Sequence, residues 1–176
     1  IGVTIVSFYR QIMPLIADQL YKGGAFAVSV LTSANSLGTI AGSFFVVLLT
    51  QVKSKGKLVL VATFIYGILL ILFGLSSGLY IGALILILLG AADAVGMTVR
   101  QAIVQLTSPD HLRGRAVSLH SFAAMTANNV GHFEMGVASE LIGARNALII
   151  GGMISMLVVI LIYIGFRGVS NYKLED

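Results

Sequence analysis

The stretch "LVLVATFIYGILLILFGL", residues 58–75, contains no charged side chain and decides the class of this fold. A helix that crosses a bilayer needs about 20 predominantly apolar residues, because each residue adds only about 1.5 Å along the helix axis. The composition agrees, since 57% of the 176 residues are hydrophobic and only 10% are charged. The mean hydropathy of +0.99 is also far above the range of water-soluble domains. The sequence therefore predicts an all-α protein that crosses a membrane several times.

The same length criterion divides the chain into six apolar segments. They cover approximately residues 1–16, 25–50, 58–75, 79–106, 116–142 and 147–166. The fifth segment is the most polar and could lie on the membrane surface, but the short connections on either side favour a spanning helix. These connections are rich in Gly, Ser, Pro or charged residues, which is typical of turns. We expect the first segment to begin inside a longer protein, because the chain opens without an initiator methionine or a signal peptide.

Several enzyme classes are disfavoured by what the sequence lacks. There is no cysteine, so thiolate chemistry and Cys-based zinc or iron–sulfur sites are excluded. The pattern "GLSSG", residues 74–78, resembles a serine nucleophile motif, but it lies between two apolar segments and not between a strand and a helix. No phosphate-binding loop is present. We expect no enzyme, no cofactor, no metal site and no nucleic-acid partner. The one enzyme class that stays open is an intramembrane serine protease, because the chain has serines and histidines in or near its apolar segments.

The lysines and arginines between the segments predict the orientation. If the segments alternate in direction, seven of them lie on one side: Lys53, Lys55, Lys57, Arg113, Arg115, Arg167 and Lys173. Only Lys22 and Arg145 lie on the other side. Because positively charged connections stay in the cytoplasm, the first side is predicted to be cytoplasmic, together with the C-terminus.

Charged residues inside the apolar segments are the most informative feature. Arg10 lies in the first segment, Asp93 and Arg100 in the fourth and Glu134 in the fifth, whereas the third and sixth carry none. A charge at mid-membrane costs on the order of 3 kcal/mol or more, so such residues usually face a protein interior or a water-filled cavity. We therefore expect the first, fourth and fifth segments to line a cavity and the third and sixth to face lipid.

The fifth segment, with "NNVGHFEMG" at residues 128–136, cannot point all its polar groups into one cavity. Asn128 and His132 are four residues apart and share a helix face. Glu134 lies about 160° around the helix from His132. Two interpretations of Glu134 stay open: it pairs with Arg10 or Arg100, or it takes part in proton coupling or substrate binding. The candidate cavity-lining residues are Arg10, Asp93, Arg100, Asn128, His132 and Glu134.

The second segment carries two weaker patterns. Gly38 and Gly42 are four residues apart, a spacing that favours close packing against another helix. A polar face without charge is formed by Ser29, Thr32, Ser33, Asn35, Ser36 and Thr39. We expect the glycines to serve packing and the polar face to contribute less to a cavity than the charged segments do.

Three stretches carry a family resemblance: "ADAVGMTVRQ" at residues 92–101, "SPDHLRGR" at 108–115 and "GHFEMG" at 131–136. With the six segments, they resemble the C-terminal half of a major facilitator superfamily transporter. More narrowly, they are similar to drug and siderophore exporters related to the enterobactin exporter. The resemblance covers nearly the whole chain. It implies that the six segments form a 3+3 inverted repeat. This six-helix bundle would pack in the bilayer against an N-terminal six-helix half that is missing from the chain.

The resemblance also extends to the connections on the predicted cytoplasmic side. "QVKSKGK", residues 51–57, is similar to the superfamily's loop motif, and Lys55, Gly56 and Lys57 match it although its aspartate is absent. Arg113, Gly114 and Arg115 belong to the next cytoplasmic connection. This resemblance implies a multi-pass protein of the bacterial inner membrane with a cytoplasmic C-terminus.

The function implied by the resemblance is efflux of a small molecule, a siderophore or an amphipathic drug, by alternating access. The proton gradient would supply the energy, with Asp93 or Glu134 as the proton acceptor. Arg10 and Arg100 would then either neutralise the acids or attract an anionic substrate. Two other classes stay open from composition alone: a six-helix channel and a structural partner in a larger membrane complex.

Overall fold

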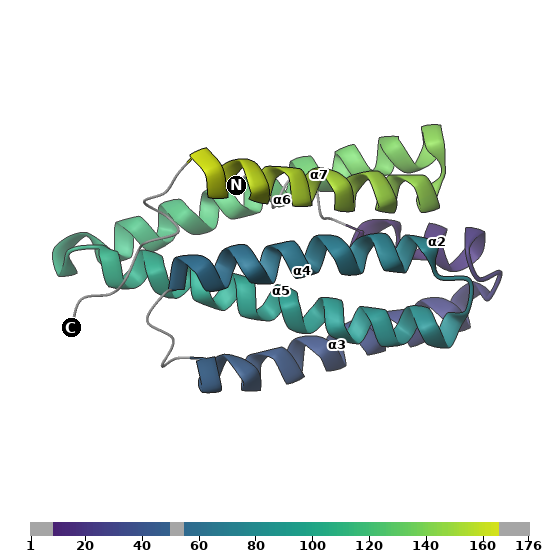
Figure 1. Cartoon of the computed structure of the whole chain (residues 1–176), viewed down its shortest axis with the longest axis horizontal. Helices are drawn as coiled ribbons and strands as arrows, with labels where there is room; N and C mark the ends of the chain where they lie inside the picture. The colour runs from purple at the N-terminus through teal and green to yellow at the C-terminus, as the bar shows by residue number, and fades with distance from the viewer. Residues whose placement is uncertain (1–8, 50–54, 166–176) are drawn as a thin grey trace.

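The computed structural model describes residues 9–49 and 55–165, and every regular element in these ranges is helical (Figure 1). The all-α prediction is therefore confirmed. The elements are η1 (Arg10–Ile12), α2 (Met13–Gln19), α3 (Gly24–Leu49), α4 (Lys55–Leu75), α5 (Leu79–Thr107), η2 (Asp110–Leu112), α6 (Arg113–Ile142) and α7 (Ala144–Gly165). The second to sixth expected segments correspond to α3 to α7. The expected first segment lies partly outside the described residues, and its described part forms η1 and α2.

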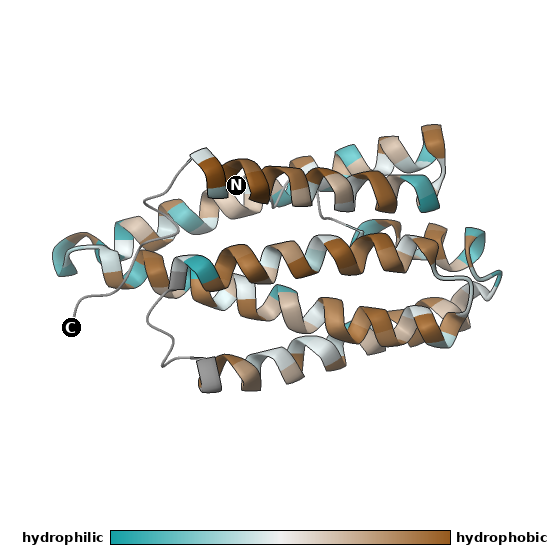
Figure 2. Cartoon of the chain, in the orientation of Figure 1, coloured by the Kyte–Doolittle hydropathy of each residue, from teal (hydrophilic) through white to brown (hydrophobic). Residues whose placement is uncertain are grey.

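Four of the described helices are long and apolar enough to cross a membrane. They cover Gly24–Val47, Gly56–Leu75, Leu79–Thr107 and Ala144–Gly165. Helix α6 has 30 residues and is long enough, but it is the most polar of the long helices, and Figure 2 shows it as a mixture of hydrophilic and hydrophobic residues. A multi-pass membrane protein is thus supported.

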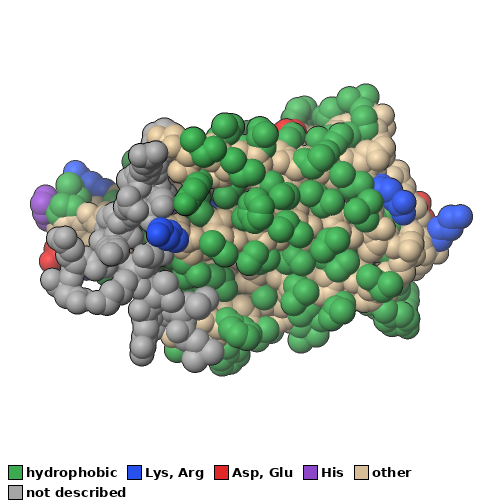
Figure 3. Space-filling view, viewed as in Figure 1, with side chains coloured by type: hydrophobic (Ala, Val, Ile, Leu, Met, Phe, Trp, Pro, Cys, Tyr) green, Lys and Arg blue, Asp and Glu red, His purple; other side chains and the backbone are tan. Residues whose placement is uncertain are grey.

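The long helices run back and forth along the longest axis of the molecule, so that successive connections lie at opposite ends (Figure 1). Helix α3 packs mainly on α5, and α4 packs on both α5 and α7. On the face shown in Figure 3, hydrophobic side chains cover the middle and most lysines and arginines lie toward the two ends. This distribution suits a bundle whose middle contacts lipid and whose ends contact water.

Helix α4 corrects one expectation. It was expected to face lipid because it contains no charge, yet Leu69, Leu70 and Phe73 are buried within the bundle. The physical reason is that lipid and a protein core are both apolar, so a charge-free helix is compatible with either. Helix α4 packs on both α5 and α7 and leaves one face exposed, which carries Val61 and Leu72.

The core holds the N-terminal part of the described chain in place. Tyr9 is almost fully buried, and its ring meets the edge of Phe73 with centroids 6.0 Å apart. Its hydroxyl oxygen accepts a hydrogen bond of 2.6 Å from the Asn35 amide on α3. Ile16 and Ala17 of α2 are completely buried. These contacts fix the backbone at residue 9 and thereby the position of the next residue, Arg10.

Helices α3 and α5 approach so closely that only glycine fits at three positions. A Cβ atom at Gly42 would lie 2.5 Å from the carbonyl oxygen of Ala91. A Cβ atom at Gly38 would overlap the carbonyl group of Ile87, and one at Gly90 would overlap that of Asn35. The close packing predicted from Gly38 and Gly42 is confirmed. It fixes α5 against α3 at Gly90, about one helical turn before Asp93.

Gly38→Ala should destabilise the bundle by about 1–3 kcal/mol, the usual cost of forcing extra volume into a packed contact. The added methyl group would collide with backbone atoms of α5, so the two helices would have to move apart. The thermal unfolding midpoint of the purified full-length protein in detergent measures the effect. Gly136→Ala in α6 is the matched control, because a Cβ there meets nothing within 4 Å. Equal midpoints for the two variants would contradict the close contact.

Candidate functional site

A cavity of about 410 Å³ lies between η1, α4, α5 and α6. Its size falls within the range of small-molecule sites, about 300–1,000 Å³. The polar residues that line it are Tyr9, Arg10, Thr63, Tyr66, Asp93, Arg100, Gln101, His120, Ser121 and Asn128. The remainder of its wall is made of small residues and two methionines, Met97 and Met125. The cavity thus combines charge, hydrogen-bonding groups and apolar surface.

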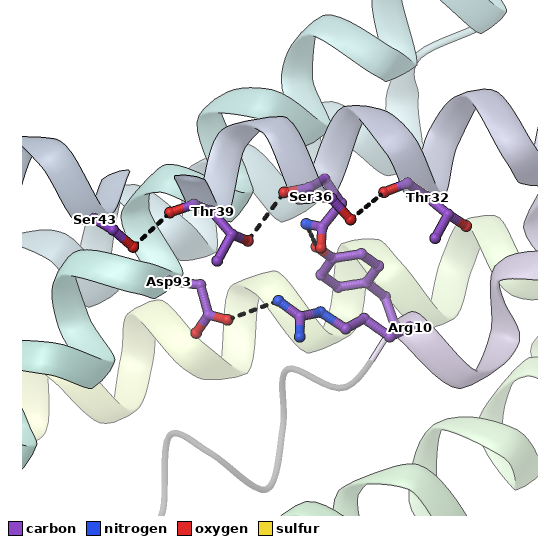
Figure 4. Close-up of polar contacts among 8 residues, drawn as sticks. Arg10, Thr32, Ser36, Thr39, Ser43 and Asp93 are labelled. Atoms are coloured by element: carbon purple, nitrogen blue, oxygen red, sulfur yellow. Dashed lines mark hydrogen bonds and ion pairs between the residues drawn. The ribbon is translucent and has the colours of Figure 1, made fainter. Parts of the chain in front are cut away.

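An ion pair joins two walls of this cavity. The Nη2 atom of Arg10 lies 3.1 Å from Oδ2 of Asp93, and Figure 4 shows the two side chains pointing toward one another, one from η1 and the other from α5. The side chains keep 47% and 36% of their surface exposed, respectively. A proton or a ligand in the cavity can therefore reach the carboxylate without disrupting the core.

Arg100 lies two helical turns along α5 from Asp93, about 10.5 Å of rise. Its side chain is partly buried and makes no salt bridge with any residue in the described ranges. Gly96 lies on the preceding turn, where an added Cβ would lie 3.9 Å from Nη2 of Arg100. The cavity wall therefore carries two arginines and one carboxylate.

The polar groups of α6 separate as the helical spacing predicts. Asn128 lines the cavity, and its Oδ1 atom is buried without a hydrogen-bond partner in the part of the chain that the structure describes. His132 is partly buried and does not belong to the cavity lining. Glu134 is exposed and borders a separate, small groove between α6 and α7, formed with residues such as Met135 and Ile150.

The interpretation that Glu134 pairs with Arg10 or Arg100 is wrong for the described structure. Arg10 is paired with Asp93, and Glu134 makes no salt bridge within residues 9–49 and 55–165. The reason is geometric, because the face of α6 that carries Asn128 meets the cavity while Glu134 lies on a different face.

Four of the six candidate residues therefore meet at one cavity, namely Arg10, Asp93, Arg100 and Asn128. The sequence reasoning missed His120 and Ser121, although His120 and Asn128 are eight residues apart and share a helix face. It also missed Thr63 and Tyr66, which are isolated polar residues in an apolar helix and gave no signal by themselves.

The polar face of α3 does not line this cavity. The hydroxyl groups of Ser29, Ser36, Thr39 and Ser43 each donate to the carbonyl oxygen four residues earlier in the same helix. Figure 4 shows the bonds of Ser36, Thr39 and Ser43 beside the Arg10–Asp93 pair. Only Asn35 reaches the site, through its bond to Tyr9.

The connection between α5 and α6 is fixed by Arg113. Its guanidinium contacts Asp110 at 2.6 Å, and its Nε donates to the carbonyl oxygen of Gln105 at 3.1 Å. Gly114 and Arg115 follow in the exposed first turn of α6. In the other predicted loop motif, Lys55, Gly56 and Lys57 form the first turn of α4, while residues 51–54 lie outside the described ranges. No metal-binding cluster occurs among the described residues.

The family model for transmembrane secretion effectors matches residues 4–173, so the chain belongs to this family of the major facilitator superfamily. Comparison with curated proteins and with solved structures gave no match. The family supports a role in membrane transport or efflux and favours a transporter over an enzyme. The narrower resemblance to the enterobactin exporter is not shown by this match.

A double-mutant cycle on Arg10→Gln and Asp93→Asn should give a coupling energy of about 1 kcal/mol, because both side chains are partly exposed and solvent screens their attraction. Each single variant leaves one charge unpaired, so the double variant should be more stable than the sum of the two losses predicts. Thermal unfolding of the purified full-length protein measures all four species. The cycle on Asp110 and Arg113 is the control, since Asp110 is 90% exposed and should couple more weakly. Additive losses at Arg10 and Asp93 would show that the pair does not form.

Proposed function

We propose that this chain forms the C-terminal six-helix bundle of a twelve-helix secondary transporter that exports a small molecule by alternating access. The Arg10–Asp93 pair at the cavity wall carries the proposal, because a charged pair exposed to a cavity among membrane-spanning helices is typical of a transport pathway. Membership of the secretion effector family supports transport in the outward direction. A second six-helix half of the same protein would complete the site from the other side.

The ion pair is suited to respond to protons. Asp93 belongs to α5, and Arg10 belongs to the separate η1 element. When Asp93 takes up a proton, it loses the charge that attracts Arg10, and the tie between the two elements weakens. A transporter alternates by favouring one of two arrangements, and a ligand shifts the balance only if it binds the two states differently. We propose that the proton is that ligand and that the proton gradient supplies the energy.

Asp93 is a better candidate for this role than Glu134. Asp93 faces the cavity and has a cationic partner whose interaction changes on protonation. Glu134 lies outside the cavity in the groove between α6 and α7, so its protonation would not alter the Arg10 contact directly. Glu134 would then lie at the contact of this bundle with lipid or with the other half of the protein.

We also propose an orientation, a membrane and a substrate for this protein. The excess of lysines and arginines in the connections on one side supports a cytoplasmic C-terminus. The resemblance to bacterial exporters supports a location in the bacterial inner membrane. The expected substrate is a siderophore or an amphipathic drug.

Asp93→Asn should lower proton-driven export by about tenfold or more, a loss equivalent to about 1.4 kcal/mol, whereas Glu134→Gln should leave it within about twofold. The assay uses the full-length protein in proteoliposomes with an imposed pH gradient. Substrate exchange without a gradient is the internal control, because Asp93→Asn should remove the coupling and keep the exchange. Undiminished proton-driven export by Asp93→Asn would refute the coupling role. A conductance without coupling would instead indicate a channel.

A further inference from the structure

Resting on the transport function above, we propose that the substrate of this cavity is an organic anion and that Arg100 binds its negative group. The charges of the lining residues carry the first step. Asp93 is the only carboxylate among them, and Arg10 already engages it. Arg100 thus leaves the described lining with one uncompensated positive charge.

The position of Arg100 makes this charge significant. Helix α5 is one of the candidate membrane spans, and Arg100 lies within it. A charged side chain in such a helix is stabilised by a counter-charge or by water. Arg100 has no salt bridge within the described ranges, and its side chain borders a cavity that can admit both. An anion that enters the cavity would therefore gain more from Arg100 than from the paired Arg10.

The neighbourhood of Arg100 leaves room for a ligand. Gly96, on the turn that precedes Arg100, has no side chain to cover the guanidinium. Gln101 and Asn128 also line the cavity and can hydrogen-bond a bound polar group. A planar guanidinium can bind a carboxylate, phosphate or sulfonate through two parallel hydrogen bonds, which a lysine cannot do.

The remaining wall indicates the body of the substrate. Met97 and Met125 border the cavity with 62% and 68% of their surface exposed, and flexible thioether side chains pack well against aromatic or irregular apolar groups. Tyr66 adds an aromatic surface from α4. The cavity is therefore suited to an amphipathic molecule with one acidic group and one apolar part.

Three compounds of one shape test the charge preference: 2-naphthoate, 2-naphthamide and 2-naphthamidine, which are anionic, neutral and cationic. Equilibrium dialysis against the purified full-length protein, with protein-free micelles as the blank, gives the three affinities. We expect naphthoate to bind about tenfold more tightly than naphthamide, and naphthamidine to bind most weakly. Equal affinities, no binding of any compound, or a preference for naphthamidine would overturn the proposal.

The variants assign the preference to one residue. Arg100→Gln should reduce the affinity for naphthoate to that for naphthamide, and Arg100→Lys should restore part of the difference because it keeps the charge. Arg145→Gln, which removes an exposed arginine outside the cavity, should change neither affinity. Unchanged binding of naphthamide to Arg100→Gln shows that the cavity is intact. A naphthoate preference that survives Arg100→Gln would refute the role of Arg100.

This experiment separates the inference from the proposed function, because binding does not require transport. An Arg100-dependent anion preference without proton-driven export would support the binding site and refute the transport proposal. Proton-driven export without any anion preference would refute the site alone.

Discussion

An arginine among membrane-spanning helices needs a counter-charge or water, and the structure gives Arg10 both through Asp93 and the adjoining cavity. The surrounding packing serves to bring these two side chains together. Tyr9, held by Phe73 and Asn35, fixes the backbone beside Arg10. The glycine contacts between α3 and α5 fix the helix that carries Asp93. The interior thus combines an apolar anchor with one polar contact that a single proton can change.

Apolar run length predicted helices α3, α4, α5 and α7 because it measures the property that a bilayer selects. Apolar run length could not predict which of these helices pack against each other. Helix α4 has no charge, and this is equally compatible with lipid on all sides and with the middle of a bundle, where the structure places it. The side chains of Thr63 and Tyr66 became part of the cavity only through that packing, so no spacing rule could have identified them.

Charged residues were better guides than hydroxyl groups for a physical reason. A charge such as that of Asp93 cannot be satisfied by its own helix backbone, so its position indicates a cavity or a partner. A serine or threonine can donate to the carbonyl oxygen four residues earlier, as Ser36 and Thr39 do. Glu134 shows the limit of the charge signal. Its position in the sequence marks it as unusual, but only the packing of α6 shows that it lies outside the cavity.

The two proposed roles of the cavity constrain the order of events in export. Protonation of Asp93 would leave Arg10 without its counter-charge, and the described lining would then carry two uncompensated arginines and not one. An anion at Arg100 would be held more tightly in that state, because neutral Asp93 no longer repels it and Arg10 is free to attract it. An outward-facing transporter that took up its proton first would therefore retain its substrate. Because such coupling is reciprocal, a bound anion at Arg100 would in turn favour protonation of Asp93. Proton-driven export therefore requires that the state carrying both ligands does not reorient, so that the anion moves outward without the proton and the proton moves inward without the anion.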